Sequence, residues 1–316
     1  MAKKKTDVII ANPIYDAVFK NLMATSKGTN KDIAGYFIGT ILGEEIADID
    51  LLPQEYTYLK KTKTQKEAET LKSIRLDFVA TIRTRSGDYK RILIEIQKSQ
   101  NPIDLLRFRT YLGEQYKQLD TITVKDNRIE QVLPIVVIYM LGFPLPEIET
   151  IVLKVNRTYM DMINGEEVKS RSPFIECLTH DGYFIQVSRI NRDTYTEWKN
   201  CSELKTMLSL FEQDYFVDEN FLKKYPYSIT NKNIKKMVET LEYIATDPKV
   251  RRAMQEEYWA AQNEIIWENQ VTELSNQNAT LSNQNATLSN QNATLSNQNA
   301  VLRSLLQKAG IDIPST

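Results

Sequence analysis

Apolar and polar residues alternate along two neighbouring stretches of the chain, and this alternation predicts a central β-hairpin. Every second residue from Ile74 to Ile82 is apolar, and Ile92, Ile94 and Ile96 repeat the pattern on a second strand. The intervening Arg85-Ser86-Gly87 suits a three-residue loop with Gly87 in the left-handed conformation. That loop sets a register in which Asp77 lies directly across from Glu95.

The polar face of this hairpin carries two carboxylates. Asp77 and Glu95 would repel each other on facing strands unless a cation lay between them. A hard divalent ion bound through oxygen is the natural occupant. The alternative is a surface cross-strand pair that a nearby arginine neutralises.

Helical spacing predicts helices on the amino-terminal side of the hairpin. Asn12 suits an N-cap with Pro13 at the first helical position, and apolar residues follow at helical spacing. Asp16 lies off that apolar stripe and four residues before Lys20, so the pattern alone predicts a surface ion pair. A second short helix is expected over Ile33–Leu42.

A helix starting at Pro102, with Asn101 as its cap, is predicted after the hairpin. Its buried stripe is expected to contain Leu105, Phe108, Leu112, Tyr116 and Leu119. Arg107 and Arg109 lie outside this stripe and are candidates for phosphate contacts, the alternative being ion pairs within the fold. The apolar run Val132–Met140 then predicts a buried strand.

The later part of the chain contains a second predicted hairpin and further helices. The hairpin strands are Phe174–Leu178 and Tyr183–Val187, and the helices include Lys232–Thr246 and a segment from Pro248 onward. We interpret His180 as a loop or strand-end residue. As the single histidine of the chain, it excludes a multi-histidine metal site.

The tail repeats Leu-Ser-Asn-Gln-Asn-Ala-Thr almost perfectly. Its leucines recur every seventh residue, at Leu274, Leu281, Leu288, Leu295 and Leu302. With leucine at heptad position d, position a holds Val271 and then asparagines, a pattern that favours a parallel two-stranded coiled coil. We expect a homodimer through these leucines. A polar low-complexity tract with little order is the alternative.

Composition sets broad limits on function. The chain has 316 residues and a net charge of −1, so any nucleic-acid contact must come from a local basic surface. Its two cysteines are too few for a disulfide framework. We expect a cytoplasmic protein without a signal peptide or a membrane span.

Asp77 followed by Glu95-Ile96-Gln97 resembles the PD-(D/E)xK nuclease motif, and more narrowly the recombination-promoting nuclease and transposase family of bacteria. The resemblance includes three flanking segments, Asn12-Pro13-Ile14-Tyr15-Asp16-Ala17-Val18-Phe19-Lys20, Leu52-Pro53-Gln54-Glu55-Tyr56 and Arg107-Phe108-Arg109-Thr110-Tyr111-Leu112. It implies an α/β fold with an αβββαβ nuclease core and a mixed sheet over residues 1–145. A mixed α+β, mostly helical extension over residues 146–250 and a coiled-coil helix over residues 251–316 would follow.

The resemblance also implies chemistry. Asp77, Glu95 and the main-chain carbonyl of Ile96 would bind Mg²⁺, with Mn²⁺ or Ca²⁺ as alternatives. Gln97 takes the place of the usual lysine and, since an amide takes no proton, it would only orient water or a phosphate oxygen. Asp16 would lie at the edge of the active site.

The expected partner is DNA, with its phosphates contacted by Lys20, Lys98, Arg107 and Arg109. The predicted function is a Mg²⁺-dependent DNA endonuclease that promotes recombination. A weak or inactive nuclease-fold scaffold that binds DNA and assembles through its coiled coil is the main alternative. A true transposase is a third, although the usual transposase triad of carboxylates is not evident in the sequence.

Overall fold

The protein is described here from a computed structural model. The described residues are 8–25, 28–52, 55–58, 72–75, 77–98, 102–124, 127–190, 202–214, 216–218, 221–226 and 229–310. The chain divides into two compact units, Met1–Gln255 and Glu256–Thr316. Asn101, expected as a helix cap, and residues 53–54 of the second resembling segment lie outside the described residues.

A mixed six-stranded sheet forms the centre of the first unit. Its strands, in spatial order, are β12 (Val152–Val155), β15 (His180–Gln186), β11 (Ile135–Leu141), β8 (Tyr89–Gln97), β7 (Phe78–Thr84) and β4 (Ile46–Leu51). β11 is parallel to both β8 and β15, and the other pairings are antiparallel. With α2 (Lys31–Leu42) and α3 (Pro102–Gln115), the order α2, β4, β7, β8, α3, β11 confirms the αβββαβ core.

The β7–β8 hairpin has the predicted register. Phe78 pairs with Ile94, and Gly87 in the connecting loop has a φ of 97°. The prediction of one strand from residue 74 was wrong, because β6 (Lys72–Arg75) pairs with β5 (Glu55–Tyr58) in a separate two-stranded sheet. Asp77 therefore lies in a bend just before β7.

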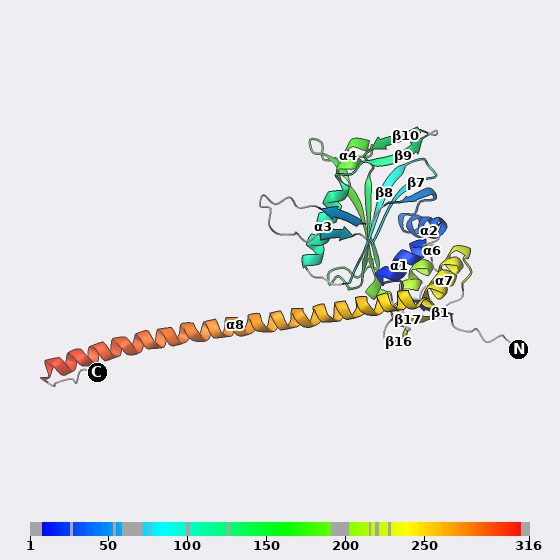
Figure 1. Ribbon diagram of the computed structural model, residues 1–316. Coiled ribbons are helices and arrows are strands. Elements are labelled where there is room, and N and C mark those ends of the chain that lie inside the picture. The colour runs from blue at the N-terminus through cyan, green and yellow to red at the C-terminus, as the bar shows by residue number, and fades with distance from the viewer. Residues whose placement is uncertain are drawn as a thin grey trace, which may run out of the picture. The chain divides into compact units, whose positions relative to one another are not determined.

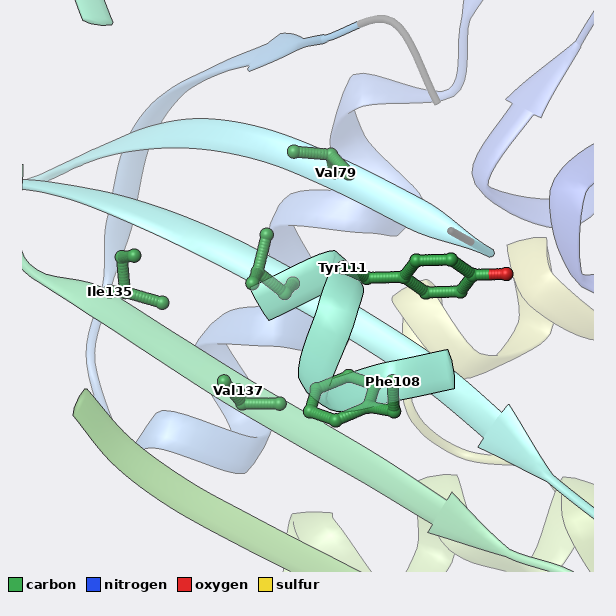
Figure 2. Close-up of a cluster of buried hydrophobic side chains, with 6 residues drawn as sticks. Val79, Phe108, Tyr111, Ile135 and Val137 are labelled. Atoms are coloured by element: carbon green, nitrogen blue, oxygen red, sulfur yellow. The ribbon is translucent and has the colours of Figure 1, made fainter. Parts of the chain in front are cut away.

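Helices cover both faces of the sheet (Figure 1): α3 lies on one side, and α2 and α7 (Lys232–Ala245) lie on the other with α1 (Asp16–Met23). Figure 2 shows how α3 packs, with Phe108 and Tyr111 against Val79 of β7 and Val137 of β11. The stripe expected on α3 was partly wrong, since Leu105 is 58% exposed. Leu119, also 58% exposed, lies beyond the end of α3 at Gln115, and the sheet is packed instead by Phe108 and Tyr111.

A buried ion pair fixes the end of α3 to the sheet. Arg91 of β8 donates from Nε to Asp120 Oδ1 at 2.9 Å, and from Nη1 to the main-chain and side-chain oxygens of Gln115. Thr81 also donates to Asp120. Both ionic side chains are almost fully buried, so they depend on each other for compensation of charge.

The helix α1 begins later than its sequence predicts. Residues 12–15 form a turn instead of the first helical positions. The Asn12 side chain accepts from the Ile14 amide at 3.3 Å, and the Tyr15 amide donates to the main-chain oxygen of Asn12. Asp16 is thus the first residue of α1, while the second helix, α2, is confirmed.

The sheet continues beyond residue 145 through β12 and β15. The hairpin expected around His180 was wrong, because residues 173–178 form the helix α4 (Pro173–Leu178) with Pro173 in the first turn. β15 instead pairs in parallel with β11, from Ile135 opposite His180 to Leu141 opposite Gln186.

Smaller elements complete the first unit. A three-stranded sheet joins the amino-terminal strand β1 to residues 216–218 and 222–225, with β17 between β1 and β16. The remaining elements, with their bounds, are β1 (Val8–Ala11), β2 (Ala24–Thr25), β3 (Gly28–Thr29), β9 (Asp120–Val124), β10 (Asn127–Gln131), β13 (Tyr159–Asp161), β14 (Glu166–Val168), η1 (Val187–Arg189), α6 (Glu203–Leu208), η2 (Ser209–Phe211), β16 (Phe216–Asp218) and β17 (Leu222–Tyr225).

The tail forms one continuous helix, α8 (Pro248–Lys308). The five repeat leucines are more than half exposed along it, so pairing with another helix stays a prediction. Among the helices that the structure describes, none combines the length and apolar composition needed to cross a membrane.

Candidate active site

Asp77 is positioned by the end of the β7–β8 hairpin. The observed register, continued by one residue past Phe78 and Ile94, brings Asp77 across from Glu95. The bend before β7 turns the Asp77 side chain toward β8, where Oδ2 accepts a 2.6 Å hydrogen bond from the Ile96 amide. The Ile96 main chain therefore lies at the Asp77 carboxylate.

Glu95 is the most enclosed member of this group. It lies on a sheet strand with neighbours on both sides, and its side chain is 4% exposed. Arg107 of α3, half exposed, brings Nη2 to within 3.9 Å of Glu95 Oε1. Glu95 Oε2 is buried and makes no hydrogen bond in the described structure, which is costly for a carboxylate oxygen unless a further ligand binds there.

α1 adds a third carboxylate and a lysine to this end of the sheet. Lys20 Nζ lies 2.6 Å from Asp16 Oδ1 and 4.0 Å from Asp77 Oδ1. The i,i+4 ion pair predicted for Asp16 and Lys20 is confirmed. The pair lies beside Asp77, however, because Lys20 Nζ is 4.0 Å from Asp77 Oδ1. α1 is therefore packed next to the carboxylates of the hairpin.

Burial and crowding disfavour the charged forms of both central carboxyl groups. Burial raises the pKa of Asp77 to about 7, with a further contribution from the charge of Asp16. Burial also raises the pKa of Glu95 to about 9, together with the charge of Asp77 and against the opposing effect of Arg107. The nearby cations therefore do not fully compensate the negative charge that Asp77 and Glu95 would carry when both are ionised.

A divalent cation fits this chemistry. The donor atoms are all oxygen, and the two carboxylates destabilise each other. One of these oxygens, Glu95 Oε2, is buried and makes no hydrogen bond to the residues that the structure describes. In the part of the chain that the structure describes, no three His, Cys, Asp or Glu side chains are grouped as a complete metal cage. Mg²⁺ does not need one, because it commonly binds through one or two carboxylates and keeps several waters.

The other predicted residues lie at different distances from the carboxylates. Gln97 alternates onto the same strand face as Glu95, and its main-chain oxygen accepts from Gly142 at 2.8 Å. Lys98 Nζ instead lies 4.3 Å from the centre of the Tyr15 ring. Arg109 is exposed on α3. The roles of these residues in binding or catalysis stay predictions.

Two further residues at the site carried no signal in the sequence. Tyr139 of β11 is the register partner of Glu95 and stacks on Phe184, with ring centres 4.7 Å apart. A Cβ on Gly142 would lie 3.3 Å from Lys98 Cα and 3.5 Å from Ile14 Cδ1. Gly142 thus permits close packing between β8 and the turn before α1, which only the tertiary structure reveals.

Comparison with known proteins supports these observations. A family model described as PD-(D/E)XK nuclease family transposase matches residues 13–267. The matched region contains the hairpin, α1, α3 and the strands beyond residue 145. No curated protein and no solved structure matches the chain.

Proposed function

The chain belongs to the PD-(D/E)XK nuclease family transposases, and from this membership we propose that it is a Mg²⁺-dependent DNA endonuclease that promotes recombination. One observation carries the proposal beyond the family. Two carboxyl groups, Asp77 and Glu95, are crowded at a strand end with a buried oxygen that makes no hydrogen bond in the described structure. A site of this kind is unfavourable in itself and becomes favourable when a cation binds.

The carboxylates of Asp77 and Glu95, with the main-chain carbonyl of Ile96, would hold the ion. When bound, Mg²⁺ polarises a phosphodiester and lowers the pKa of a bound water. Mn²⁺ is a second ion suited to the same oxygen ligands. The Ile96 amide holds Asp77 in place through its 2.6 Å hydrogen bond, so the main chain fixes the carboxylate before any ion arrives.

Lys20 brings a positive charge to Asp77, as Arg107 does to Glu95. Its ammonium lies 4.0 Å from Asp77 Oδ1, and Asp16 holds it there at 2.6 Å. Gln97 replaces the motif lysine and has no proton to exchange, so we assign it the orientation of water or of a phosphate oxygen. Lys20 would supply the positive charge near the developing negative charge that Gln97 does not.

The basic residues around the site would contact the DNA backbone. Arg107 is half exposed beside Glu95, and Arg109 projects from the same helix. A guanidinium can donate two parallel hydrogen bonds to a phosphate. Lys98 would contribute charge from the opposite side, next to Tyr15.

Nicking of supercoiled plasmid tests this function. We expect nicked circles with Mg²⁺ or Mn²⁺, none with EDTA, and none from Asp77→Ala at equal concentration. Lys235→Ala is a matched surface control, since Lys235 lies on α7 in an exposed pair with Glu239. If the wild-type protein binds DNA but produces no nicks with either ion, the scaffold function replaces the nuclease.

The assembly proposed with this function is a parallel dimer through α8. The five leucines share a heptad position and are each more than half exposed on the helix. Two such helices would bury the leucines against each other, with the asparagines at position a selecting two strands in register. A dimer would present two nuclease sites to one DNA.

A further inference from the structure

We infer that Gln213 is a positioning residue for the nuclease site, acting through the turn of residues 12–15. The inference rests on the proposed function and assigns a role to a segment of the chain more than a hundred residues after the motif. Gln213 follows η2, and its side chain hydrogen-bonds to Asn12, Phe211 and Glu212 instead of to Asp77 or Glu95. It acts instead on the residue at which the turn before α1 begins.

A reciprocal pair of amide hydrogen bonds joins Gln213 to Asn12. Asn12 Nδ2 donates to Gln213 Oε1 at 2.9 Å, and Gln213 Nε2 donates to Asn12 Oδ1 at 3.2 Å. Gln213 Nε2 also donates to the main-chain oxygen of Phe211 at 2.7 Å, which fixes the amide from the other side. Asn12 is 1% exposed, so loss of these bonds is not made good by bulk water.

Neighbouring contacts bring the same late segment against the turn. The Asn12 amide donates to the main-chain oxygen of Phe221 at 3.0 Å. The rings of Tyr15 and Phe221 lie 5.8 Å apart, and Ala11 of β1 pairs with Leu222 of β17. The side chain of Gln213 adds two hydrogen bonds to this packing of Phe221 and Leu222 against the turn, both of them to Asn12.

The turn leads directly to the groups beside the carboxylates. Asp16 is the first residue of α1, and its Oδ1 lies 2.6 Å from Lys20 Nζ. Lys20 Nζ in turn lies 4.0 Å from Asp77 Oδ1. A shift of the turn by about 1 Å would change these distances by a large fraction, and displacements of that size can cost about a hundredfold in rate. Gln213 therefore positions Asp16 and Lys20 without touching the DNA.

The test uses the full-length protein and two single variants. Gln213→Met keeps the side-chain length while removing every amide hydrogen bond. Asn231→Ala is the control: Asn231 caps α7 by accepting from the amides of Asn233 and Ile234. Its loss destabilises a helix that packs on β1 and α1 but leaves the hydrogen bonds between Gln213 and Asn12 in place. Nicking is measured well below both melting temperatures, and Mn²⁺ stoichiometry is measured by calorimetry.

We expect Gln213→Met to lower kcat for nicking about tenfold or more, with the KM for plasmid and the Mn²⁺ stoichiometry unchanged. Asn12→Ala should lower kcat similarly, and the double variant should be no slower than the slower single variant, since both remove one contact. Asn231→Ala should keep the wild-type kcat. Equal kcat losses in Gln213→Met and Asn231→Ala, or additive losses in the double variant, would overturn the inference.

A second measurement separates this inference from the proposed function. Hydrogen exchange of the amides in residues 14–20 should be faster in Gln213→Met, by about tenfold, and unchanged in Asn231→Ala. If the wild-type protein never nicks DNA but exchange still rises in Gln213→Met alone, the function fails while the positioning role stands. Unchanged exchange together with wild-type nicking in Gln213→Met refutes the positioning role alone.

Discussion

Replacing Glu95 by glutamine should stabilise the metal-free protein while abolishing its proposed activity. A carboxyl group whose pKa is higher in the folded than in the unfolded protein binds more protons when folded. Its contribution therefore destabilises the fold as pH rises between the two pKa values. For Glu95 that window runs from the ordinary value of 4.5 to about 9, and glutamine does not titrate in it.

The size of the effect follows from the same window. Between pKa 4.5 and pH 7, the preference for the protonated form is worth about 1.4 kcal/mol per pH unit, or about 3 kcal/mol in all. Because Asp77 shares the interaction, we expect Glu95→Gln to gain about 2–3 kcal/mol, raising Tm by about 5–10 °C in a unit of this size. The side chain is almost fully buried, so solvent screens little of this.

Thermal unfolding in EDTA at pH 5, 6, 7 and 8 measures the effect. The wild-type Tm should fall with rising pH more steeply than that of Glu95→Gln. Adding Mg²⁺ should then stabilise the wild-type protein and leave the variant unchanged, because only the wild type has both carboxylates. Glu239→Gln, at an exposed pair with Lys235, should stay close to wild type throughout. A Glu95→Gln variant that melts at or below the wild type in EDTA at pH 7 would refute the reasoning.

Three other changes have expected outcomes. Lys20→Met should slow plasmid nicking about tenfold or more because its ammonium lies near Asp77, and Lys98→Met should slow it less; the reverse order would show the wrong lysine was chosen. Asp120→Ala should lower the free energy of unfolding in urea by about 3–5 kcal/mol, since it leaves the buried charge of Arg91 without its carboxylate. The double variant Arg91→Met with Asp120→Leu should recover most of this loss. An Asp120→Ala variant as stable as the wild type would contradict the reasoning. Truncation after Gln270 should reduce the mass measured by light scattering to that of a monomer, because each buried leucine contributes about 1.5–3 kcal/mol to pairing, and plasmid products should shift from linear to nicked; a truncated dimer would assign assembly to the first unit.

The hairpin was predictable because its determinants are local. Gly87 occupies a left-handed position that sets the loop length, and the loop sets the register of Phe78 with Ile94. The separate strand β6 was not predictable. The alternation of apolar and polar residues continues from β6 through Asp77 into β7, although β6 pairs with β5 and β7 pairs with β8. The apolar pattern reports which face is buried, but it does not name the neighbouring strand.

The candidate site was predictable only in part, for a related reason. Asp77 and Glu95 lie on one hairpin, and their proximity follows from its register. Lys20 and Asp16 come from a helix whose orientation depends on distant contacts. The residue pattern alone predicted only their ion pair, and their place at the site was an expectation from the family resemblance. Gln213 bonds to Asn12 across 201 residues, a separation at which no pattern in a single sequence marks a pair.

The α4 segment illustrates a different failure. Residues 174–178 are rich in apolar side chains and precede a tight-looking His-Asp-Gly, so they read as a hairpin strand. In the structure α4 has no buried residue. β15, which was expected to pair with this segment, pairs in parallel with β11 instead. A short apolar run does not distinguish a strand from an exposed helix.

The repeat of α8 has a consequence for how this protein can change over generations. A near-identical seven-residue unit lengthens or shortens easily when its gene is copied, and seven residues turn an α-helix through almost two complete turns. Gain or loss of one unit therefore changes the angle between Leu274 and Leu302 around the helix axis by only about 20°, while the helix changes length by about 10 Å. The length of the tail helix can therefore change in regular steps without a compensating substitution elsewhere in the chain.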